Sequence, residues 1–385
     1  MTFPRTNAVI IGAGMIGTVH ARAVRAAGGH VRGVVASTPA RSAQLATEWD
    51  VPVAYPDLSS VLADESVDVV HVCTPNALHA RQAAAALRAG KHVICEKPLA
   101  TTVADARMLE ATAAAADRVL AVPFVYRYHP LVREIRARAE RGEFGAWQLI
   151  HGSYLQDWML GERSTNWRVD ASLGGRSRAF ADIGSHWCDL VEWVAGIRFA
   201  EVTARLAITR RERPAADAVT FGPAAPAAAD TGPVSTEDVA AVLMRTADGV
   251  LGSVTVSQVS AGRKNRLWFE LDGAEGSAVF DQEQPESIWL GGPDHSRVVV
   301  RDPGFGSPEQ RRLAVLPAGH AQGYADCFRA FIADAYAAMA GEQVVGLPTA
   351  TDGVRSARLV DAVLHAGETL TWTPITPEFP EELAA

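Results

Sequence analysis

The chain has 385 residues, of which 48% are hydrophobic and 21% charged, and its formal net charge is −8. This length exceeds one ordinary hydrophobic core and predicts two domains, while the composition is that of a globular protein and excludes a disordered or fibrous one. The negative charge argues against a nucleic-acid partner, and without an apolar run of about 18 residues we expect no membrane partner and a cytoplasmic location.

The first predicted element is a strand at Asn7–Ile11, which leads straight into the sequence Gly12-Ala13-Gly14-Met15-Ile16-Gly17. In this G-x-G-x-x-G pattern the first glycine permits a tight turn, the second lets the backbone approach a pyrophosphate, and the third lets helix and strand pack closely. The pyrophosphate would lie on the N–H groups that open the helix expected over Met15–Ala27, including those of Met15 and Ile16. The alternative is a plain glycine turn, because one such motif among 32 glycines is weak.

The next strand, Val31–Val35, bears on the choice of cofactor. A site selective for NAD usually carries Asp or Glu after this strand, where Ala36 stands here. Ser37, Thr38 and Arg41 would instead accommodate a 2′-phosphate, so we favour NADP over NAD. The alternative is that Ser37 and Thr38 cap the following helix and that Arg41 is exposed.

The first 125 residues alternate apolar β-branched runs with Ala- and Leu-rich runs, a pattern that predicts a doubly wound parallel sheet covered by helices. The predicted strands are Asn7–Ile11, Val31–Val35, Val69–Cys73, His92–Cys95 and Val119–Pro123. The predicted helices are Met15–Ala27, Arg41–Glu48, Leu78–Ala89 and Val103–Ala115.

Two polar turns follow predicted strands of this sheet. The turn Thr74-Pro75-Asn76-Ala77-Leu78-His79 follows the strand that ends at Cys73, and Glu96-Lys97-Pro98 follows the strand that ends at Cys95. Open α/β sheets bind ligands at the carboxyl ends of their strands, so both turns are candidate ligand contacts. The candidate cofactor-binding residues in them are Thr74, Pro75, Asn76, His79, Glu96 and Lys97. The alternatives are a helix cap for Thr74 or Asn76 and a surface position for Lys97.

After Pro130 the pattern changes to one helix, ending near Gly142, and then to strands that alternate polar and apolar residues. This favours an antiparallel sheet with one face exposed to water or covered by a partner. The predicted strands are Gln148–Leu155, Val202–Arg210, Val239–Met244, Gly252–Val259, Arg266–Leu271 and Ser277–Asp281. The segment Pro214–Val234, rich in Pro, Ala, Asp and Gly, is predicted to be a long loop or insertion.

Aromatic and polar residues that suit a carbohydrate follow the first of these strands. Gln156 and Trp158 come directly after it, and Trp167 and Arg168 lie a little further along. Aromatic faces stack on the C–H face of a sugar ring, while amide and guanidinium groups bind its hydroxyls. The alternative is that both tryptophans belong to the core.

Asp182 and His186 stand four residues apart at the start of an apolar helix. If the helix includes Asp182, both side chains share one face and can interact. Such a pair suits general acid–base chemistry, whereas a lone histidine on a helix is more often structural.

A late segment carries a helical stripe of apolar residues that predicts core packing. Its members are Tyr324, Phe328, Phe331, Ala335 and Met339. The four cysteines lack C-x-x-C spacing, so we expect buried thiols with no disulfide and no metal site. They are Cys73, Cys95, Cys188 and Cys327.

Together the glycine turn, the two polar turns, and Asp182-x-Gly184-x-His186 with Asp189-Leu190 resemble the glucose–fructose oxidoreductase / inositol dehydrogenase / rhizopine catabolism (Gfo/Idh/MocA) family. The segment Gly319–Asp326 is similar to that family's late helix start, so the resemblance spans almost the whole chain.

This resemblance implies a Rossmann domain over residues 1–127, on which a late helix can pack back. It also implies an α/β domain over 128–385 with a large open, mainly antiparallel sheet that forms homodimers or homotetramers. The implied activity is NAD(P)-dependent hydride transfer to or from a secondary alcohol or ketone of a sugar, cyclitol or sugar derivative. Lys97 matches the family's catalytic lysine, and Asp182 and His186 match its Asp/His pair. Arg127 falls where family members line the substrate pocket, which His320 and Tyr324 would help to close.

The expected chemistry assigns His186 as the base for the substrate hydroxyl, Asp182 as its orienting partner and Lys97 as a hydrogen-bond donor to the reacting oxygen. Lys97 as the principal proton carrier stays open. Two further hypotheses are an NADPH-dependent reductase of keto- or anhydro-sugars and a non-catalytic dinucleotide-binding regulator, against which the presence of all three residues counts.

Overall fold

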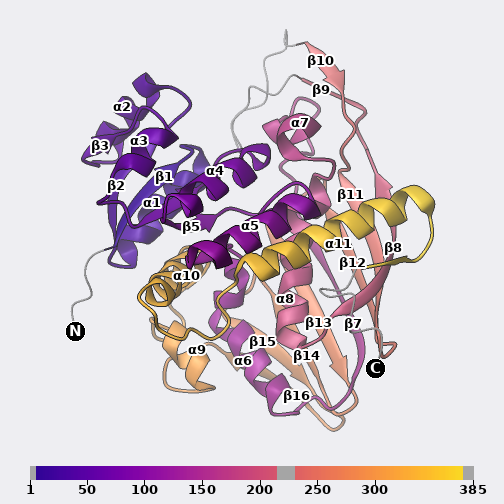
Figure 1. Cartoon of the computed structure of the whole chain (residues 1–385). Helices are drawn as coiled ribbons and strands as arrows, with labels where there is room; N and C mark the ends of the chain where they lie inside the picture. Colours follow the sequence, from indigo (N-terminus) through magenta and orange to yellow (C-terminus); the bar gives the residue numbers. More distant parts are fainter. Residues whose placement is uncertain (1–5, 215–229, 376–385) are drawn as a thin grey trace. The chain divides into compact units, whose positions relative to one another are not determined.

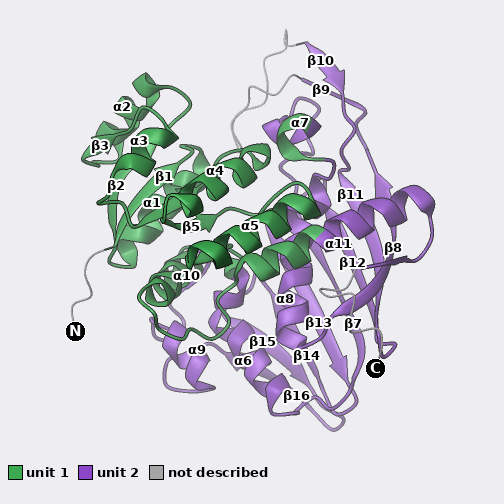
Figure 2. Cartoon of the chain, in the orientation of Figure 1, with its two compact units in different colours: residues 1–125, 172–175, 325–357 green, residues 126–171, 176–324, 358–385 purple. Residues whose placement is uncertain are grey.

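The computed structural model describes residues 6–214 and 230–375, which form two compact units, each with its own hydrophobic core (Figure 2). Unit 1 comprises residues 1–125, 172–175 and 325–357, and unit 2 comprises residues 126–171, 176–324 and 358–385.

Unit 1 is built on six parallel strands in the order β3-β2-β1-β4-β5-β6. The strands are β1 (Asn7–Ile11), β2 (His30–Val35), β3 (Val53–Ala54), β4 (Val69–Val72), β5 (His92–Cys95) and β6 (Leu120–Ala121). The chain moves outward from β1 to β3 and then returns to pair β4 with the other side of β1. The predicted doubly wound parallel sheet is therefore confirmed, with its switch point beside β1.

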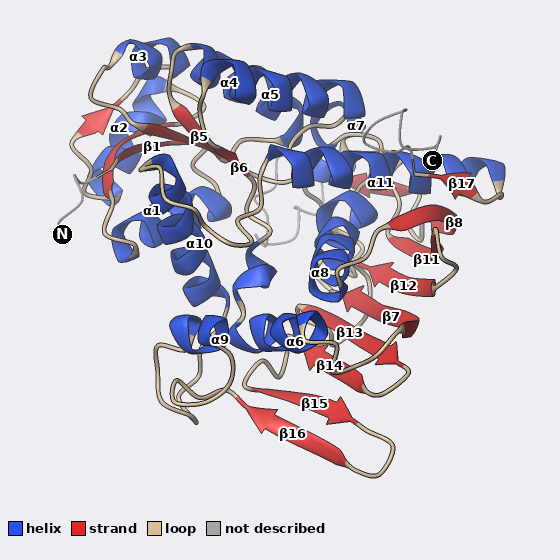
Figure 3. Ribbon diagram, turned by 60° about the horizontal axis from the view of Figure 1, so that its bottom comes forward, coloured by secondary structure: helices blue, strands red, loops and turns tan. Residues whose placement is uncertain are grey.

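Helices cover both faces of this sheet, α3, α4 and α5 on one and α1 and α10 on the other (Figure 3). The helices of the unit are α1 (Met15–Ala26), α2 (Pro39–Glu48), α3 (Leu58–Ala63), α4 (Asn76–Arg88), α5 (Val103–Ala116), α10 (Tyr324–Met339) and the first part of α11 (Ala350–Thr369). Small alanines on α4 and α5, such as Ala84 and Ala106, are buried and let these helices pack closely on the strands.

Unit 2 is built on nine strands in the order β16-β15-β14-β13-β7-β12-β11-β8-β17. Figure 1 labels these strands except β17, which is labelled beside β8 in Figure 3. The strands are β7 (Trp147–Leu155), β8 (Phe199–Ala207), β11 (Val239–Thr246), β12 (Leu251–Ser257), β13 (Arg266–Gly273), β14 (Ser277–Asp281), β15 (Ser287–Gly291), β16 (Ser296–Val300) and β17 (Thr373–Pro374). Neighbouring strands are antiparallel except for β7 and β12, which run parallel. The predicted, mainly antiparallel sheet is thus confirmed.

Within unit 2, α6 (Pro130–Glu140), α8 (Ser185–Ala195) and the second part of α11 pack on one face of this sheet (Figure 3). The indole of Trp187 on α8 is fully buried and donates a hydrogen bond of 2.9 Å to the carbonyl of Trp268 on β13. Among the described residues no helix covers the opposite face, where Leu149, Leu243 and Leu251 are exposed.

The predicted elements differ from the structure at short or exposed strands and at several helices. The strand predicted over Val119–Pro123 is only two residues long, and β3, β15, β16 and β17 were not predicted. Neither were α3, α7 (Ala171–Gly174), α9 (Pro308–Leu313) and the 20-residue α11. Of the segment Pro214–Val234, residues 215–229 lie outside the described residues, and its ends pair as strands β9 (Glu212–Pro214) and β10 (Thr231–Pro233). The prediction allowed a long loop or an insertion, and the short pairing of β9 with β10 at the ends of the segment differs from a loop but not from an insertion.

Other predictions about packing hold in part. The stripe on α10 is buried at Phe328, Phe331 and Ala335, whereas Tyr324 is 37% exposed. All four cysteines are buried, as predicted. No helix of the described residues is long and apolar enough to cross a bilayer.

A buried cluster of one carboxylate and two guanidinium groups holds β9 against the sheet of unit 2. The Asp238 carboxylate, fully buried, accepts hydrogen bonds from Arg178, from Arg213 at 2.9 Å, and from the amide and hydroxyl of Thr209 at 2.7 Å. Burial raises the pKa of this carboxyl group, but the two guanidinium groups and Thr209 outweigh burial and leave it below its ordinary value of 3.8.

We expect Asp238→Asn to lower the free energy of unfolding by about 3–5 kcal/mol, because it leaves two buried guanidinium groups without a counter-charge. Urea unfolding measures this loss, and Asp281→Asn, which breaks the partly exposed pair with Arg266, is the control at under about 1 kcal/mol. The contribution of Asp238 is present above pH 3.8 and is lost as the pH falls through the lower folded-state pKa. Equal losses in both variants would contradict this account.

Candidate active site

The glycine turn of unit 1 has the geometry that a dinucleotide requires. Gly12 has a φ of +99°, and a Cβ there would lie 2.4 Å from the Cys73 carbonyl oxygen. A Cβ on Gly17 would lie 2.0 Å from the Gly12 carbonyl oxygen. By contrast, a Cβ on Gly14 would meet nothing within 4 Å among the described residues, and no side chain described caps α1, which begins at Met15. The helix start therefore presents open backbone, which fits a pyrophosphate.

The turns after β4 and β5 are joined by the imidazole of His79. Its Nδ1 lies 2.8 Å from the carbonyl oxygen of Pro98, and its Nε2 lies 2.8 Å from that of Thr74. Asn76 donates a hydrogen bond of 2.8 Å to the carbonyl of Gly174, and the Thr74 hydroxyl donates one of 2.6 Å to Gln82. These side chains hold the backbone at the carboxyl ends of the strands, where Pro75 opens α4.

Glu96 and Lys97 lie at the same edge of the sheet. The Glu96 carboxylate is 6% exposed and accepts hydrogen bonds from the Lys97 amide at 3.1 Å and from His20 Nε2 at 3.0 Å. Burial raises the pKa of Glu96, yet the His20 donor and the charge of Lys97 prevail and the pKa lies below its ordinary value. The Lys97–Pro98 peptide bond is cis.

The segment after β2 adopts the alternative that the sequence left open. The Thr38 hydroxyl caps α2 by accepting the Arg41 amide at 3.2 Å, and the Arg41 guanidinium pairs with Glu48 at 3.2 Å. Ser37 and Thr38 are exposed, and the Arg41 side chain is 41% exposed. The residues that we expected to meet a 2′-phosphate therefore lie at an accessible helix start.

In unit 2, Asp182 lies in a π-helical turn, Phe180–Gly184, which leads directly into α8. One of its carboxylate oxygens accepts a hydrogen bond of 2.8 Å from Gln258, and the other lies 3.4 Å from the guanidinium of Arg168. Arg168 stacks on the ring of Trp167 at 4.3 Å. Three of the predicted residues, Asp182, Trp167 and Arg168, are thus brought together.

His186 lies in the first turn of α8, where it is 8% exposed. Its ring meets that of Tyr126 edge to face, with centroids 4.9 Å apart. The Tyr126 hydroxyl is 2.6 Å from that of Tyr154, and the ring of Tyr324 lies 6.1 Å away. His186 and Tyr324 therefore share Tyr126 as a neighbour.

A hydrogen-bonded network continues from Tyr154 to the remaining predicted residues. Asn265 accepts from the Tyr154 hydroxyl at 2.7 Å and from the Gln156 amide at 2.8 Å. The Gln156 oxygen in turn accepts from the indole of Trp158 at 2.8 Å. The network therefore links aromatic rings to amide groups, and Tyr126, Tyr154 and Gln156 are buried within it.

Two predicted substrate contacts have other partners. Arg127 is 3% exposed and forms a two-pronged ion pair with Asp189 beside the ring of Trp193. His320 is exposed, and its carbonyl accepts a hydrogen bond of 2.6 Å from Arg301. Their predicted contact with substrate stays a prediction.

Gln258 and Asn265 were missed by the sequence analysis, although one signal for Gln258 was available. Gln156 and Gln258 each follow directly after a strand, β7 and β12, and these two strands pair in parallel with Leu155 opposite Ser257. Polar residues that follow neighbouring parallel strands collect at one edge of a sheet.

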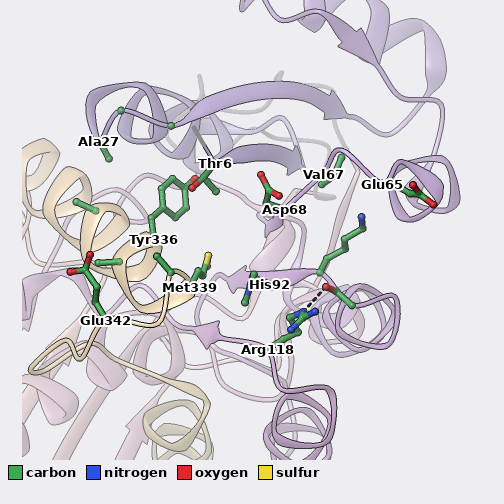
Figure 4. Close-up of a pocket in the computed structure, with 17 residues that line it drawn as sticks. Thr6, Ala27, Glu65, Val67, Asp68, His92, Arg118, Tyr336, Met339 and Glu342 are labelled. Carbon is green, nitrogen blue, oxygen red and sulfur yellow. Dashed lines mark hydrogen bonds between the residues drawn. The ribbon is translucent and has the colours of Figure 1, made fainter. Parts of the chain in front are cut away.

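A cavity of about 880 Å³ lies at the amino ends of the strands of unit 1, opposite the turns described above. It is lined by residues that precede or begin strands, such as Thr6, Asp68 and His92, and by Tyr336 and Met339 of α10 (Figure 4). It is therefore separate from the turns that follow β1, β4 and β5.

Comparison with known protein families identifies the class of protein to which the chain belongs. The family described as "Oxidoreductase family, NAD-binding Rossmann fold" matches residues 6–124, and the "GFO/IDH/MocA C-terminal domain" matches residues 132–279. The protein is thus an oxidoreductase with a nicotinamide-dinucleotide-binding Rossmann unit. The chain belongs to the Gfo/Idh/MocA family, which confirms the resemblance seen in its motifs.

Individual relatives cover most of the chain. It is 31% identical to levoglucosan dehydrogenase of Pseudarthrobacter phenanthrenivorans, over 96% of this chain and 98% of the relative. It is 32% identical to inositol 2-dehydrogenase of Acidothermus cellulolyticus, over 72% and 73% respectively. A solved structure of levoglucosan dehydrogenase with NADH and levoglucosan superposes with a TM-score of 0.88 at 29% identity, over 97% of this chain and all of that one.

Two glycine variants test the dinucleotide site. We expect Gly14→Ala to keep the melting temperature, because its Cβ enters open space, but to weaken NADH and NADPH binding about tenfold by obstructing the backbone approach. Gly12→Ala should instead destabilise the protein by about 1–3 kcal/mol because of its positive φ and the contact with Cys73. Fluorescence titration and thermal unfolding measure the two effects, and unchanged affinity in Gly14→Ala would be the contrary result.

Proposed function

We propose that the protein transfers a hydride between a nicotinamide dinucleotide and a secondary alcohol or ketone of a sugar, cyclitol or sugar derivative. The observation that carries this proposal is the cluster in unit 2, where Asp182, set between Gln258 and Arg168, precedes His186 by four residues, and His186 packs against the ring of Tyr126. The full-length similarity to levoglucosan dehydrogenase and the partial similarity to inositol 2-dehydrogenase support it.

The residues of unit 1 fit the cofactor. The open backbone at Gly14 and the start of α1 would hold the pyrophosphate, with Met15, Ile16 and Gly17 supplying the amides of the first turn. When bound, the nicotinamide supplies the hydride-accepting or hydride-donating carbon. We assign the turns Thr74–His79 and Glu96–Lys97 to the nicotinamide side of this site, because both follow central strands.

His186, Asp182 and Lys97 each have a different role in the transfer of the substrate proton. His186 takes the proton of the substrate hydroxyl during oxidation and returns it during reduction. Asp182 orients the imidazole and stabilises its charged form, and its own position is fixed by Gln258. Lys97 donates a hydrogen bond that stabilises negative charge on the reacting oxygen.

The neighbouring side chains of unit 2 suit a sugar ring. Trp158 and Trp167 offer aromatic faces, while Gln156, Arg168 and, at its exposed position, His320 offer polar groups for hydroxyls. Tyr324 lies beside Tyr126 and would close the same surface, and we assign Arg127 to its support through Asp189.

A reductase of keto- or anhydro-sugars is the second candidate. The exposed Ser37 and Thr38 and the partly exposed Arg41 would favour NADPH. The chain is 35% identical over 185 residues to 1,5-anhydro-D-fructose reductase of Ensifer adhaerens. That similarity covers 54% of the relative, so this direction of reaction rests chiefly on the cofactor preference.

We further propose that cofactor binding belongs to residues 1–127 and that substrate binding and self-association belong to residues 128–385. Support for a homodimer or homotetramer comes from the uncovered face of the nine-stranded sheet, where Leu243 and Leu251 are each 53% exposed.

A panel of sugars, cyclitols, anhydro-sugars and keto-sugars, followed by nicotinamide absorbance, tests the activity. We expect turnover of at least one anhydro-sugar or cyclitol by the wild type, with kcat about 10²–10³-fold lower in Lys97→Ala and about 10²–10⁴-fold lower in His186→Ala. Arg81→Ala, an exposed position on α4, is the control and should keep full activity. Equal rates in wild type and both variants would refute the residue roles, and binding of cofactor without turnover would favour the regulator.

The cofactor preference is tested by titrating NADPH and NADH separately. We expect tighter binding of NADPH, and Arg41→Ala should weaken NADPH about tenfold and leave NADH within about twofold, because a guanidinium binds a phosphate in a charge-assisted pair. Tighter NADH in the wild type, or equal effects of Arg41→Ala on both, would overturn the preference for NADP.

A further inference from the structure

Four polar side chains form a continuous hydrogen-bonded chain through the interior of unit 1. Glu96 Oε1 lies 3.0 Å from His20 Nε2, His20 Nδ1 lies 2.9 Å from His71 Nδ1, and His71 Nε2 lies 3.1 Å from the hydroxyl of Tyr336. His20 comes from α1, His71 from β4 and Tyr336 from α10. Both histidines are 0% exposed.

Such a hydrogen-bonded network is costly where its two histidines lie among apolar residues. The ring of Phe328 packs edge to face on His20 at 5.2 Å, and the residues paired with His71 on the two neighbouring strands, Ile10 and Ile94, are fully buried. A buried polar network is tolerated when every member is satisfied, and then it fixes its members rigidly.

The two ends of this hydrogen-bonded network lie at opposite ends of the parallel strands, Tyr336 near their amino ends and Glu96 at their carboxyl ends. At one end Tyr336 lines the cavity beside Asp68 and His92 (Figure 4). At the other end the second oxygen of Glu96 accepts the backbone amide of Lys97 at 3.1 Å. The chain therefore ends on the backbone from which the Lys97 side chain extends.

The charges determine where the protons lie. The pKa of Glu96 is below its ordinary value, so its carboxylate is ionised and can only accept hydrogen bonds, and His20 Nε2 must carry a proton. Burial and, secondarily, the charge of His20 lower the pKa of His71 well below its ordinary value, so His71 is neutral and has a single N–H.

Two proton arrangements satisfy all of these contacts. In one, Tyr336 donates to His71 Nε2 and His71 Nδ1 donates to His20. In the other, His20 carries both protons and the direction of the His71 and Tyr336 bonds is reversed. In both, His20 donates to Glu96, and Tyr336 completes the pairing of His71.

We infer that His20, His71 and Tyr336 are positioning residues for Lys97, which act through Glu96 on its backbone amide. This inference rests on the catalytic role proposed above for Lys97. The groups that face Glu96 are His20, Lys97 and His79, together with the thiols of Cys73 and Cys95.

The first test compares two replacements of His20. Gln at this position retains an N–H donor toward Glu96 and an acceptor toward His71, whereas Leu retains neither. We expect kcat to fall about tenfold or more in His20→Leu and about threefold in His20→Gln, with the dissociation constant of the cofactor within about twofold, because a small displacement of a reacting group lowers the rate steeply. A purely structural network would lower the melting temperature of both variants without lowering kcat in the folded enzyme.

The second test removes the Tyr336 hydroxyl, which is the end of the hydrogen-bonded network furthest from Lys97. Tyr336→Phe removes only the hydroxyl, and we expect a fall in kcat of about threefold to tenfold. Tyr55→Phe is the matched control, because this hydroxyl of the same unit is also hydrogen-bonded, to Asp64, but lies outside the chain. Unchanged kcat in both Tyr336→Phe and His20→Leu would overturn the inference.

A readout that does not depend on turnover separates this inference from the proposed function. Hydrogen exchange at the Lys97 amide should accelerate about tenfold in His20→Leu and Tyr336→Phe relative to the wild type and to Tyr55→Phe. If no sugar is turned over by the wild type, the proposed function fails whatever the exchange rates are. If sugar is turned over and exchange at Lys97 stays unchanged in both variants, the positioning chain is refuted.

Discussion

Parallel pairing of neighbouring strands is the constraint on which the candidate site residues of unit 1, and Gln156 and Gln258 of unit 2, depend. Parallel strands end at the same edge of a sheet, so residues far apart in the sequence collect there without any loop having to reach them. In unit 1 this edge gathers the turns after β1, β4 and β5. In unit 2 the single parallel pair, β7 with β12, places Gln156 next to Gln258 in a sheet whose other neighbours are antiparallel.

The two candidate sites each contain a carboxylate, the buried Glu96 in unit 1 and the partly buried Asp182 in unit 2, and the partners of each determine what it can do. Asp182 is held by an amide and a guanidinium, and Glu96 by an imidazole and a backbone N–H. A carboxylate with several donors keeps its charge despite burial and becomes a fixed anchor for its neighbours. The same logic applies away from the site to Asp238, whose two arginines fix the sheet rather than a ligand.

The sequence allowed the doubly wound sheet to be predicted because its strands are apolar runs that end at glycines or polar turns. Strands β1 and β5 were predicted to the residue, whereas β16 was missed because nearly all of its residues are exposed and show no alternation. The partner of Arg127 could not be predicted, since Asp189 is 62 positions away in the sequence. Thr38 illustrates the opposite case, in which a local rule for helix caps applied as stated.

The π-helical turn at Phe180–Gly184 has a consequence for how relatives of this protein are aligned. A π turn contains one residue more than an α turn, so Asp182 and His186 are not in the phase that a regular helix would give them. A relative that lacks one residue in this turn would retain both residue types and yet rotate one against the other by about 100°. The spacing between the two residues therefore carries information that their identity alone does not, and gap placement at this turn decides whether two members of the family are comparable here.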